Sequence, residues 1–183
     1  MKMAKVGTVL HVGEIDLCRL NSLQISQINK YVPLYNRWVN SPEIIEFLSG
    51  SHETIEKTAR RLHDLREKVD TDWTFVVKKQ GVPIGFCALN KVHAVQGYCE
   101  LEIFLGDNHS RGNKYGRKIV SSLCTFGFTH LELRGIVLRV LEHNTAAIAC
   151  YRHCGFNEVY RYPKVHRRKG CFYDEIIMQL NAT

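Results

Sequence analysis

The sequence of 183 residues lacks any apolar run of about 18 residues, the length at which a stretch becomes a candidate membrane span. Its first residues, Met-Lys-Met-Ala-Lys-Val, lack the apolar core of a signal peptide. Proline occurs only four times, and no stretch rich in proline and glycine divides the chain. These absences argue against a membrane span and predict one cytoplasmic domain over residues 1–183.

The seven cysteines include no pair with the Cys-x2-Cys spacing that is typical of zinc sites. Cys150 and Cys154 would share one side of a helix with His153 close by, but a structural metal site needs four ligands. We therefore expect no metal site. The cysteines are expected to be reduced and packed as small apolar side chains.

The net charge of +7 indicates an anionic partner, either a nucleic acid or an anionic cofactor. Part of this charge lies in His166-Arg-Arg-Lys169, beside Gly170 and between two strand-like segments. We interpret this cluster as a solvated hairpin tip, with a phosphate or nucleic-acid contact as the alternative. Basic and aromatic residues are not interleaved in a nucleic-acid motif, so a nucleic-acid partner ranks last.

A second concentration of positive charge lies in a predicted turn over residues 107–118. The turn follows the strand-like residues 100–106 and leads into residues 119–131, which are apolar at helical spacing. A strand, a basic turn with glycines and a helix start direct backbone N–H groups and the helix dipole at one point. The four cations around that point are Arg111, Lys114, Arg117 and Lys118. The pattern predicts a site for a pyrophosphate or a similar anion.

A second motif follows about 40 residues later, in Asn144-x6-Tyr151-x3-Gly155-Phe156. Together with Arg111-Gly-Asn-Lys-Tyr-Gly116 it resembles the GNAT superfamily of acetyl-CoA-dependent N-acetyltransferases, over residues 73–180. The segments Trp38–Glu43 and Phe172–Met178 are similar to the branch that acetylates ribosomal-protein N-termini, spermidine and some antibiotics. The resemblance implies acetyl-CoA as co-substrate and an amine as acceptor.

The expected fold is mixed α/β (α+β), with a GNAT-like central sheet that is mixed but mostly antiparallel and is flanked by helices. The N-terminal helices would form part of the acceptor site. Hairpin signals and crossover helices support this plan. The expected strands are 6–12, 15–20, 73–77, 84–89, 97–105, 136–141, 156–162 and 171–180, and the expected helices are 22–38 with Pro33 inside, 41–48, 51–69, 114–131 and 145–154.

The resemblance implies that the turn holds the pyrophosphate of acetyl-CoA, mostly through backbone N–H groups. Lys114 stands where the family has glycine, and a lysine adopts a positive φ only at some cost. Its side chain could instead add a contact to a phosphate. Backbone groups at a bulge of the preceding strand would bind the pantetheine arm and the thioester carbonyl. The predicted cofactor contacts are Phe104, Leu105, Gly106, Arg111, Gly112, Asn113, Lys114, Tyr115, Gly116, Arg117 and Asn144.

Tyr151 is the predicted general acid, because the family's tyrosine at this spacing reprotonates the leaving thiolate. A helical tyrosine packed on the sheet is the alternative. Asn144 is expected to cap the helix that carries Tyr151, and by resemblance to contact the pantetheine arm or order its loop.

Two carboxylates, Glu100 and Glu102, share one face of the strand and could bind or deprotonate the acceptor ammonium. Glu100 is preferred because it matches an acidic position common in the branch. The alternative is a solvated or salt-bridged face. Weaker acceptor-pocket candidates are Trp38, Glu43 and Glu46, while His109 and His143 are expected to be structural or exposed.

The sequence thus predicts direct acetyl transfer from acetyl-CoA to a primary amine, without a covalent acyl-enzyme. The acceptor stays open among a protein N-terminus, a polyamine, an aminoglycoside and an amino sugar. A CoA-binding regulatory module without turnover is the second reading, motivated by Lys114, and a basic nucleic-acid-binding protein is the third. The family's habit of dimerising leaves a homodimer open, and no membrane partner is expected.

Overall fold

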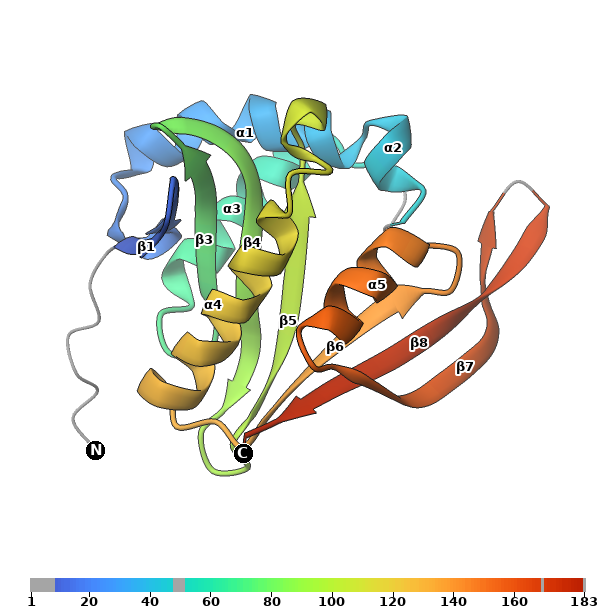
Figure 1. Ribbon diagram of the computed structural model, residues 1–183. Coiled ribbons are helices and arrows are strands. Elements are labelled where there is room, and N and C mark those ends of the chain that lie inside the picture. Colours follow the sequence, from blue (N-terminus) through green and yellow to red (C-terminus); the bar gives the residue numbers. More distant parts are fainter. Residues whose placement is uncertain (1–8, 48–51, 169, 183) are drawn as a thin grey trace.

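The computed structural model describes residues 9–47, 52–168 and 170–182, and its centre is an eight-stranded sheet (Figure 1). The strand order is β1-β2-β3-β4-β5-β6-β8-β7, and β5 with β6 is the parallel pair while the other neighbours are antiparallel. This confirms the predicted mixed, mostly antiparallel sheet. The strands are β1 (Val9–Val12), β2 (Ile15–Arg19), β3 (Trp73–Lys79), β4 (Val82–His93), β5 (Tyr98–Leu105), β6 (Gly135–Leu141), β7 (Asn157–Arg168) and β8 (Cys171–Asn181).

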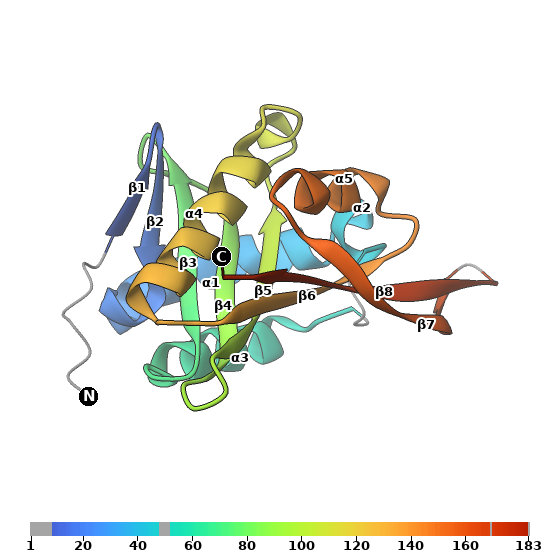
Figure 2. The same cartoon turned by 60° about the horizontal axis from the view of Figure 1, so that its bottom comes forward.

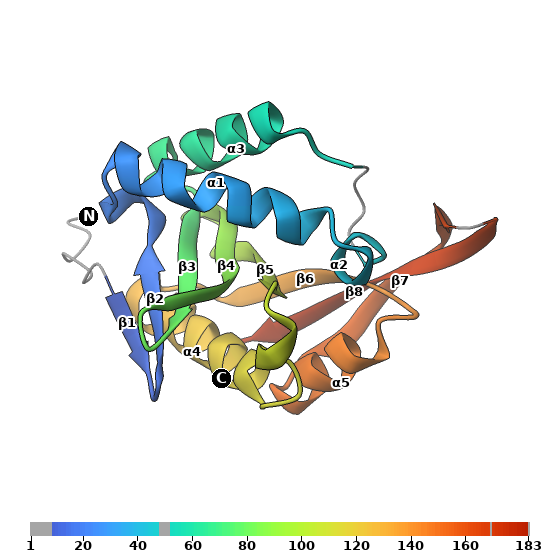
Figure 3. The same cartoon turned by 90° about the horizontal axis from the view of Figure 1, so that it is seen from above.

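Helices cover both faces of the sheet, α1 and α3 on one side and α4 and α5 on the other (Figures 2 and 3). Each side has its own apolar core, and the larger core lies beneath α4 and α5. Two layers of helices against one sheet bury both sheet faces, which explains the near-continuous burial along β3 and β4. The helices are α1 (Ile25–Val39), α2 (Pro42–Ile45), α3 (Ile55–Glu67), α4 (Tyr115–His130) and α5 (Thr145–His153).

Two boundaries near the N-terminus differ from the prediction. Ser22 does not cap α1, because its hydroxyl donates to the Arg19 carbonyl within a short 3-10 turn, and Gln24 forms the cap instead. The helix α3 ends at Glu67, so Val69 lies beyond it and is 43% exposed rather than packed on the apolar side. In both cases the helix boundary depends on a local hydrogen bond or on where the helix ends, and apolar periodicity alone does not predict either.

The feature that positions the site is the separation of β5 from β6. The two strands pair only at Tyr98–Gly135, Cys99–Ile136 and Glu100–Val137. Beyond these pairs β5 continues alongside β4 up to Leu105, while β6 continues alongside β8. In Figure 1 the two strands begin side by side and then diverge, so the sheet opens into a gap between them.

The last two strands form a long hairpin that extends from the body of the molecule (Figure 1). β7 ends at Arg168 and β8 begins at Cys171, so His166, Arg167 and Arg168 of the predicted hairpin-tip cluster lie at the end of β7, and Lys169 lies outside the described residues. β7 is longer than predicted, because it continues past a register shift between Tyr162 and His166. Within the described residues, none of the helices combines the length and the apolar character that a membrane crossing requires.

Candidate functional site

The basic turn between β5 and α4 has the backbone geometry of an anion site. Gly112 has φ +78°, and Lys114, at the N-cap of α4, has φ 61° and ψ 11°. Lysine therefore adopts the left-handed conformation that glycine adopts cheaply. The Lys114 side chain does not cap the helix, which leaves the first amides of α4 directed at the turn. We call residues 111–116 the phosphate cradle.

Two side chains of the phosphate cradle fasten it in place. The Arg111 guanidinium donates to the Leu105 carbonyl through Nε and a terminal nitrogen, at 3.2 and 3.1 Å. The Asn113 amide donates to the His109 carbonyl at 2.9 Å. Arg111 thus holds the turn against the end of β5 and Asn113 ties it to the preceding 3-10 turn, while Arg117 and Lys118 follow on the first turn of α4.

Tyr115 directs its side chain away from the phosphate cradle. Its ring is buried, and its hydroxyl donates to Glu14 Oε1 at 2.8 Å in the β1–β2 turn. Only its backbone N–H is left for a phosphate. Gly116 faces α5, where an added Cβ would lie 3.6 Å from Cys150 Sγ, an ordinary contact distance. A small side chain at this position would therefore fit against α5.

The backbone of β5 reaches the gap at alternate residues. The Gly106 N–H donates to the Ile84 carbonyl of β4 at 2.9 Å, so it points away from the gap, contrary to the predicted contact. By the alternation of an antiparallel ladder, Phe104 also faces β4, whereas Ile103 and Leu105 face the gap. The sequence analysis did not include Ile103 among the candidate contacts. The alternation of backbone directions along β5, set by its register with β4, is the signal that could have identified it.

Tyr151 lies on α5 in the core on the α4–α5 side, 8% exposed, with its ring 6.0 Å from Phe156. Burial raises the pKa of its phenol, and the charges of Cys150, Cys154 and Glu102 add to the rise. Across the chain as described, its hydroxyl has no hydrogen-bond partner. The phenol is therefore protonated at neutral pH.

Asn144 caps α5 as predicted, because its Oδ1 accepts from the Ala147 N–H at 3.2 Å. The preceding His143 packs its ring between Phe47 and Tyr173, with ring centroids 5.3 and 4.1 Å away. Both His143 ring nitrogens are buried without a hydrogen-bond partner within the described residues. The cap fixes the first residue of α5 and therefore the place of Tyr151 on the helix.

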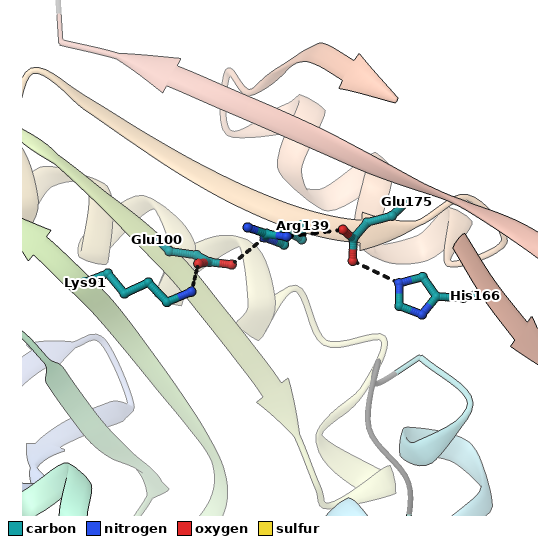
Figure 4. A network of polar contacts seen from close by, with 5 residues as sticks. All are labelled: Lys91, Glu100, Arg139, His166 and Glu175. Carbon is teal, nitrogen blue, oxygen red and sulfur yellow. Dashed lines mark hydrogen bonds and ion pairs between the residues drawn. The ribbon is translucent and has the colours of Figure 1, made fainter. Parts of the chain in front are cut away.

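Glu100 belongs to a chain of ion pairs across five neighbouring strands, β4, β5, β6, β8 and β7 (Figure 4). Its two oxygens accept from Lys91 Nζ at 2.6 Å and from Arg139 Nε at 3.1 Å. Arg139 also reaches Glu175 at 3.4 Å, and Glu175 accepts from His166 at 3.1 Å. Both carboxylate oxygens are occupied by cations, so the salt-bridged alternative describes Glu100.

Glu102 lies two residues further along β5 and has no ion pair among the described residues. Desolvation by the surrounding protein raises the pKa of its carboxyl, opposed by the Asn90 side chain, and the Glu100 charge raises it further. The Glu102 residue is nevertheless exposed, so water reaches it. A carboxylate with a raised pKa and open access is suited to accepting a proton near neutral pH.

A cleft of about 320 Å³ opens beside Gly106 on the α1 side. Trp38 forms its floor and lies so close that a Cβ on Gly106 would be 2.0 Å from the indole ring. Trp38 is also a core residue, 6% exposed and packed on Phe104. The cleft contains Glu43 but not Glu46, and its lining residues are Arg37, Trp38, Ser41, Glu43, Gly106, Asp107, Asn108 and His109.

The seven cysteines are free thiols, and the described residues contain no group of metal-ligating side chains. Cys154 Sγ lies 3.6 Å from Ser121 Oγ and 3.7 Å from the Arg117 carbonyl, which are packing contacts between α5 and α4. Burial raises the pKa of the Cys150 thiol to about 11. At neutral pH this thiol is therefore uncharged and a poor nucleophile.

Comparisons with known proteins agree with this geometry. A family model described as "Acetyltransferase (GNAT) domain" matches residues 23–157. The chain is 24% identical over 146 residues to the uncharacterized N-acetyltransferase p20 of Bacillus licheniformis, covering 77% of this chain and 82% of that protein. It is 19% identical over 165 residues to an N-acetyltransferase 9-like protein of Nematostella vectensis, covering 80% of each.

Among solved structures, the chain is similar to the spermidine N-acetyltransferase from Vibrio cholerae in complex with CoA and spermine. The TM-score is 0.79 at 20% identity, and the match covers 92% of this chain and 95% of that chain. A dodecameric structure of spermidine N-acetyltransferase from the same organism matches with a TM-score of 0.71 at 21% identity, over 92% and 94% of the two chains. At these identities the likeness shows the fold.

Proposed function

The chain belongs to the GNAT family of acetyltransferases, whose co-substrate is acetyl-CoA, and we propose that it transfers the acetyl group directly to a primary amine. The observation that carries the proposal is the arrangement around the β5–β6 gap. A phosphate cradle lies at one end of α4, Tyr151 lies on the α4–α5 side and Glu102 lies on the α1–α3 side. Direct transfer needs an anion site, a proton donor and a proton acceptor, and these three meet here.

Residues 111–117 would hold the pyrophosphate through backbone N–H groups and the cations of Lys114 and Arg117. Lys114 already has the left-handed conformation of the family's glycine, so the lysine does not oppose this role. That removes the observation that motivated a binding module without turnover. The backbone groups of Ile103 and Leu105 that face the gap would bind the pantetheine arm, and acetyl-CoA would supply the thioester carbon that the amine attacks.

Glu102 is the proposed general base. The acceptor must lose a proton from its ammonium group before the nitrogen lone pair can attack, and Glu102 would take that proton directly or through a water molecule. Glu100 was the preferred base on sequence grounds. Because Glu100 is paired with two cations, Glu102 is favoured for this step, and Glu100 would have a supporting part.

Tyr151 is the proposed general acid. As the carbon–sulfur bond breaks, the sulfur leaves as a thiolate and would take the phenolic proton, and the phenolate regains a proton from water or from the acceptor side. The raised pKa of Tyr151 keeps the proton in place until a strong base forms beside it. The nitrogen loses two protons in all. Glu102 would take the one that leaves the ammonium group and pass it to solvent, and the one that leaves the nitrogen after attack would replace the proton that Tyr151 gives to the sulfur.

A protein N-terminus, a polyamine, an aminoglycoside and an amino sugar remain the acceptor classes. A cytoplasmic location and a homodimer are also parts of the proposal, which cell fractionation and sedimentation of the purified chain would test. The first experiment is calorimetric titration with acetyl-CoA, followed by thiol release with an amine panel. We expect micromolar binding and amine-dependent thiol release, and a chain that binds no acetyl-CoA would contradict the proposal.

A further inference from the structure

The α1–α3 side of the gap contains several carboxylates, and ion pairs with cations neutralise most of them. Glu100 and Glu175 belong to what we call the ionic wall, which consists of Lys91, Glu100, Arg139, Glu175 and His166 (Figure 4). Glu100 and Glu175 are each 12% exposed at the side chain, while Arg139 is 55% exposed. The wall therefore presents the guanidinium of Arg139, rather than carboxylates, to anything that enters from solvent.

A second ion pair on the same side neutralises Glu53. Its Oε1 lies 3.0 Å from an Arg61 nitrogen, and the Glu53 side chain is 7% exposed. Arg61 also acts on Glu102, because its charge lowers the pKa of that carboxyl. Another cation therefore stands near the proposed base.

Glu102 is then the carboxylate of this group that has no ion pair among the described residues. The residues outside the described ranges include no aspartate or glutamate, so they add no further carboxylate. The cleft beside Gly106 contains Glu43 and Asp107, but it also contains Arg37, and the Asp107 carboxylate already accepts from Ser110 at 2.6 Å. Among the carboxylates beside Lys91 and Arg139, Glu102 is therefore the one left to pair with an ammonium group.

We propose that the acceptor is an amine with a single positive charge, and that Lys91 and Arg139 exclude polycationic amines by occupying Glu100. The inference rests on the proposed acetyl transfer at this site. A second ammonium group would meet Arg139 and Lys91 at close range instead of an open carboxylate. Like charges in a partly desolvated site repel, and selectivity follows from the unfavourable contact as much as from the favourable one.

This distinguishes the chain from the spermidine N-acetyltransferases of Vibrio cholerae that share its fold. At 20% identity the shared fold does not determine the acceptor, which depends on the charges that line the site. A protein N-terminus with neutral neighbouring residues has the single charge that the site accommodates. Spermidine and aminoglycosides, which are polycationic, do not.

The test uses the full chain with acetyl-CoA and two matched acceptor pairs, and it measures thiol release. The first pair is pentylamine and cadaverine, which share a five-carbon chain but differ by one charge. The second pair is two peptides of equal length with free N-termini, one with neutral residues at its second and third positions and one with lysines there. We expect kcat/KM to favour the singly charged member of each pair by about tenfold or more.

The variant Arg139→Gln tests the assignment, because it frees one oxygen of Glu100. The preference should fall to near unity through a higher kcat/KM for the polycationic member, while Arg139→Lys should retain it. Lys91→Gln frees the other oxygen and should act in the same direction if Arg139→Gln folds poorly. Arg161→Gln is the matched control, since it removes an equal charge that pairs with Glu158 and Asp174.

The outcomes separate the inference from the function. A wild-type preference for cadaverine and the lysine peptide, or an unchanged preference in both Arg139→Gln and Lys91→Gln, would overturn the inference while acetyl transfer stands. An equal loss of preference in Arg161→Gln would overturn the residue assignment. No turnover with any of the four acceptors would count against the proposed function itself, and the inference would fall with it.

Discussion

Tyr151 and Glu102 lie on opposite faces of the sheet and interact through the gap between β5 and β6. Tyr151 is in the core on the α4–α5 side, and Glu102 shares the α1–α3 face with Phe104. The two are close enough that the Glu102 charge raises the pKa of the Tyr151 phenol. An acid and a base on the two sides of one opening can serve the two ends of a reaction that takes place within it.

Glu102→Gln should lower kcat at neutral pH by about a hundredfold or more, because a positioned base contributes that much to proton transfer. Glu100→Gln is the matched control, at the residue two positions earlier on the same face of β5. It should lower kcat less, since Glu100 is already paired with Lys91 and Arg139. Steady-state kinetics with a saturating amine checks both variants. An equal effect of the two substitutions would contradict the assignment of the base.

The pH dependence follows from the raised pKa of Glu102. The base must be ionised, so kcat/KM should rise with pH through a midpoint above the ordinary glutamate value of 4.5. A folded-state pKa above the unfolded value favours folding at low pH, and this contribution is lost as pH rises through the folded pKa. Glu102→Gln should therefore unfold at a higher temperature than wild type at neutral pH, but not at pH 4.

Tyr151→Phe should lower kcat by about tenfold to a hundredfold while the fold persists, because only a proton donor is removed. Tyr115→Phe is the control from the other buried tyrosine of the site region. It removes the hydrogen bond to Glu14 and should leave kcat unchanged. Thiol release over a pH series measures both. Full turnover of Tyr151→Phe at every pH would remove Tyr151 from the acid role.

Lys114→Gly should raise the free energy of unfolding by up to about 1 kcal/mol, because lysine is held at φ 61°. Lys114→Ala removes the same charge but keeps the strain, so it separates the two effects. Denaturant unfolding measures the stability, and calorimetry measures the Kd of acetyl-CoA. Both variants should weaken binding by a similar factor if the lysine contributes only its charge.

Gly106→Ala should lower the free energy of unfolding by about 1–3 kcal/mol, since the new methyl group would overlap the Trp38 ring. The KM for the amine should rise more than the Kd for acetyl-CoA, because the cleft beside Gly106 is on the acceptor side. Gly170→Ala is a control at a glycine with open space around it, although its φ of +84° adds a backbone cost. An unaltered melting temperature in Gly106→Ala would show that Trp38 moves freely.

Most of the architecture was predictable because it depends on local patterns. The order of helices and strands follows from apolar periodicity, and Asn144 was recognised as a cap from its place before α5. The start of α1 was not predicted, because the Ser22 hydroxyl is used in a local 3-10 turn, where it donates to the Arg19 carbonyl, and Gln24 forms the cap.

The residues of the candidate site could be proposed from the sequence, but their partners could not. The ion pairs of Glu100 and Glu175 with Arg139 join residues 39 and 36 positions apart in the chain. The orientation of the Gly106 N–H depends on its register with Ile84 of the neighbouring strand. Neither relationship is visible in a single sequence, and both change the chemistry, one by neutralising a carboxylate and the other by moving a backbone contact to Ile103.

The short pairing of β5 with β6 bears on the stability of the sheet as well as on the proposed reaction. The two halves of the sheet share three residue pairs, so the seam between them is the part of the sheet with least backbone support. A ligand that bonds to the open edge of β5 and packs on α5 joins the halves across that seam. Occupancy at a hundred times Kd adds about 2.7 kcal/mol to folding by mass action alone. If acetyl-CoA binds at the proposed site, it would also stabilise the sheet at its least supported seam, and the chain would be most stable with its co-substrate bound.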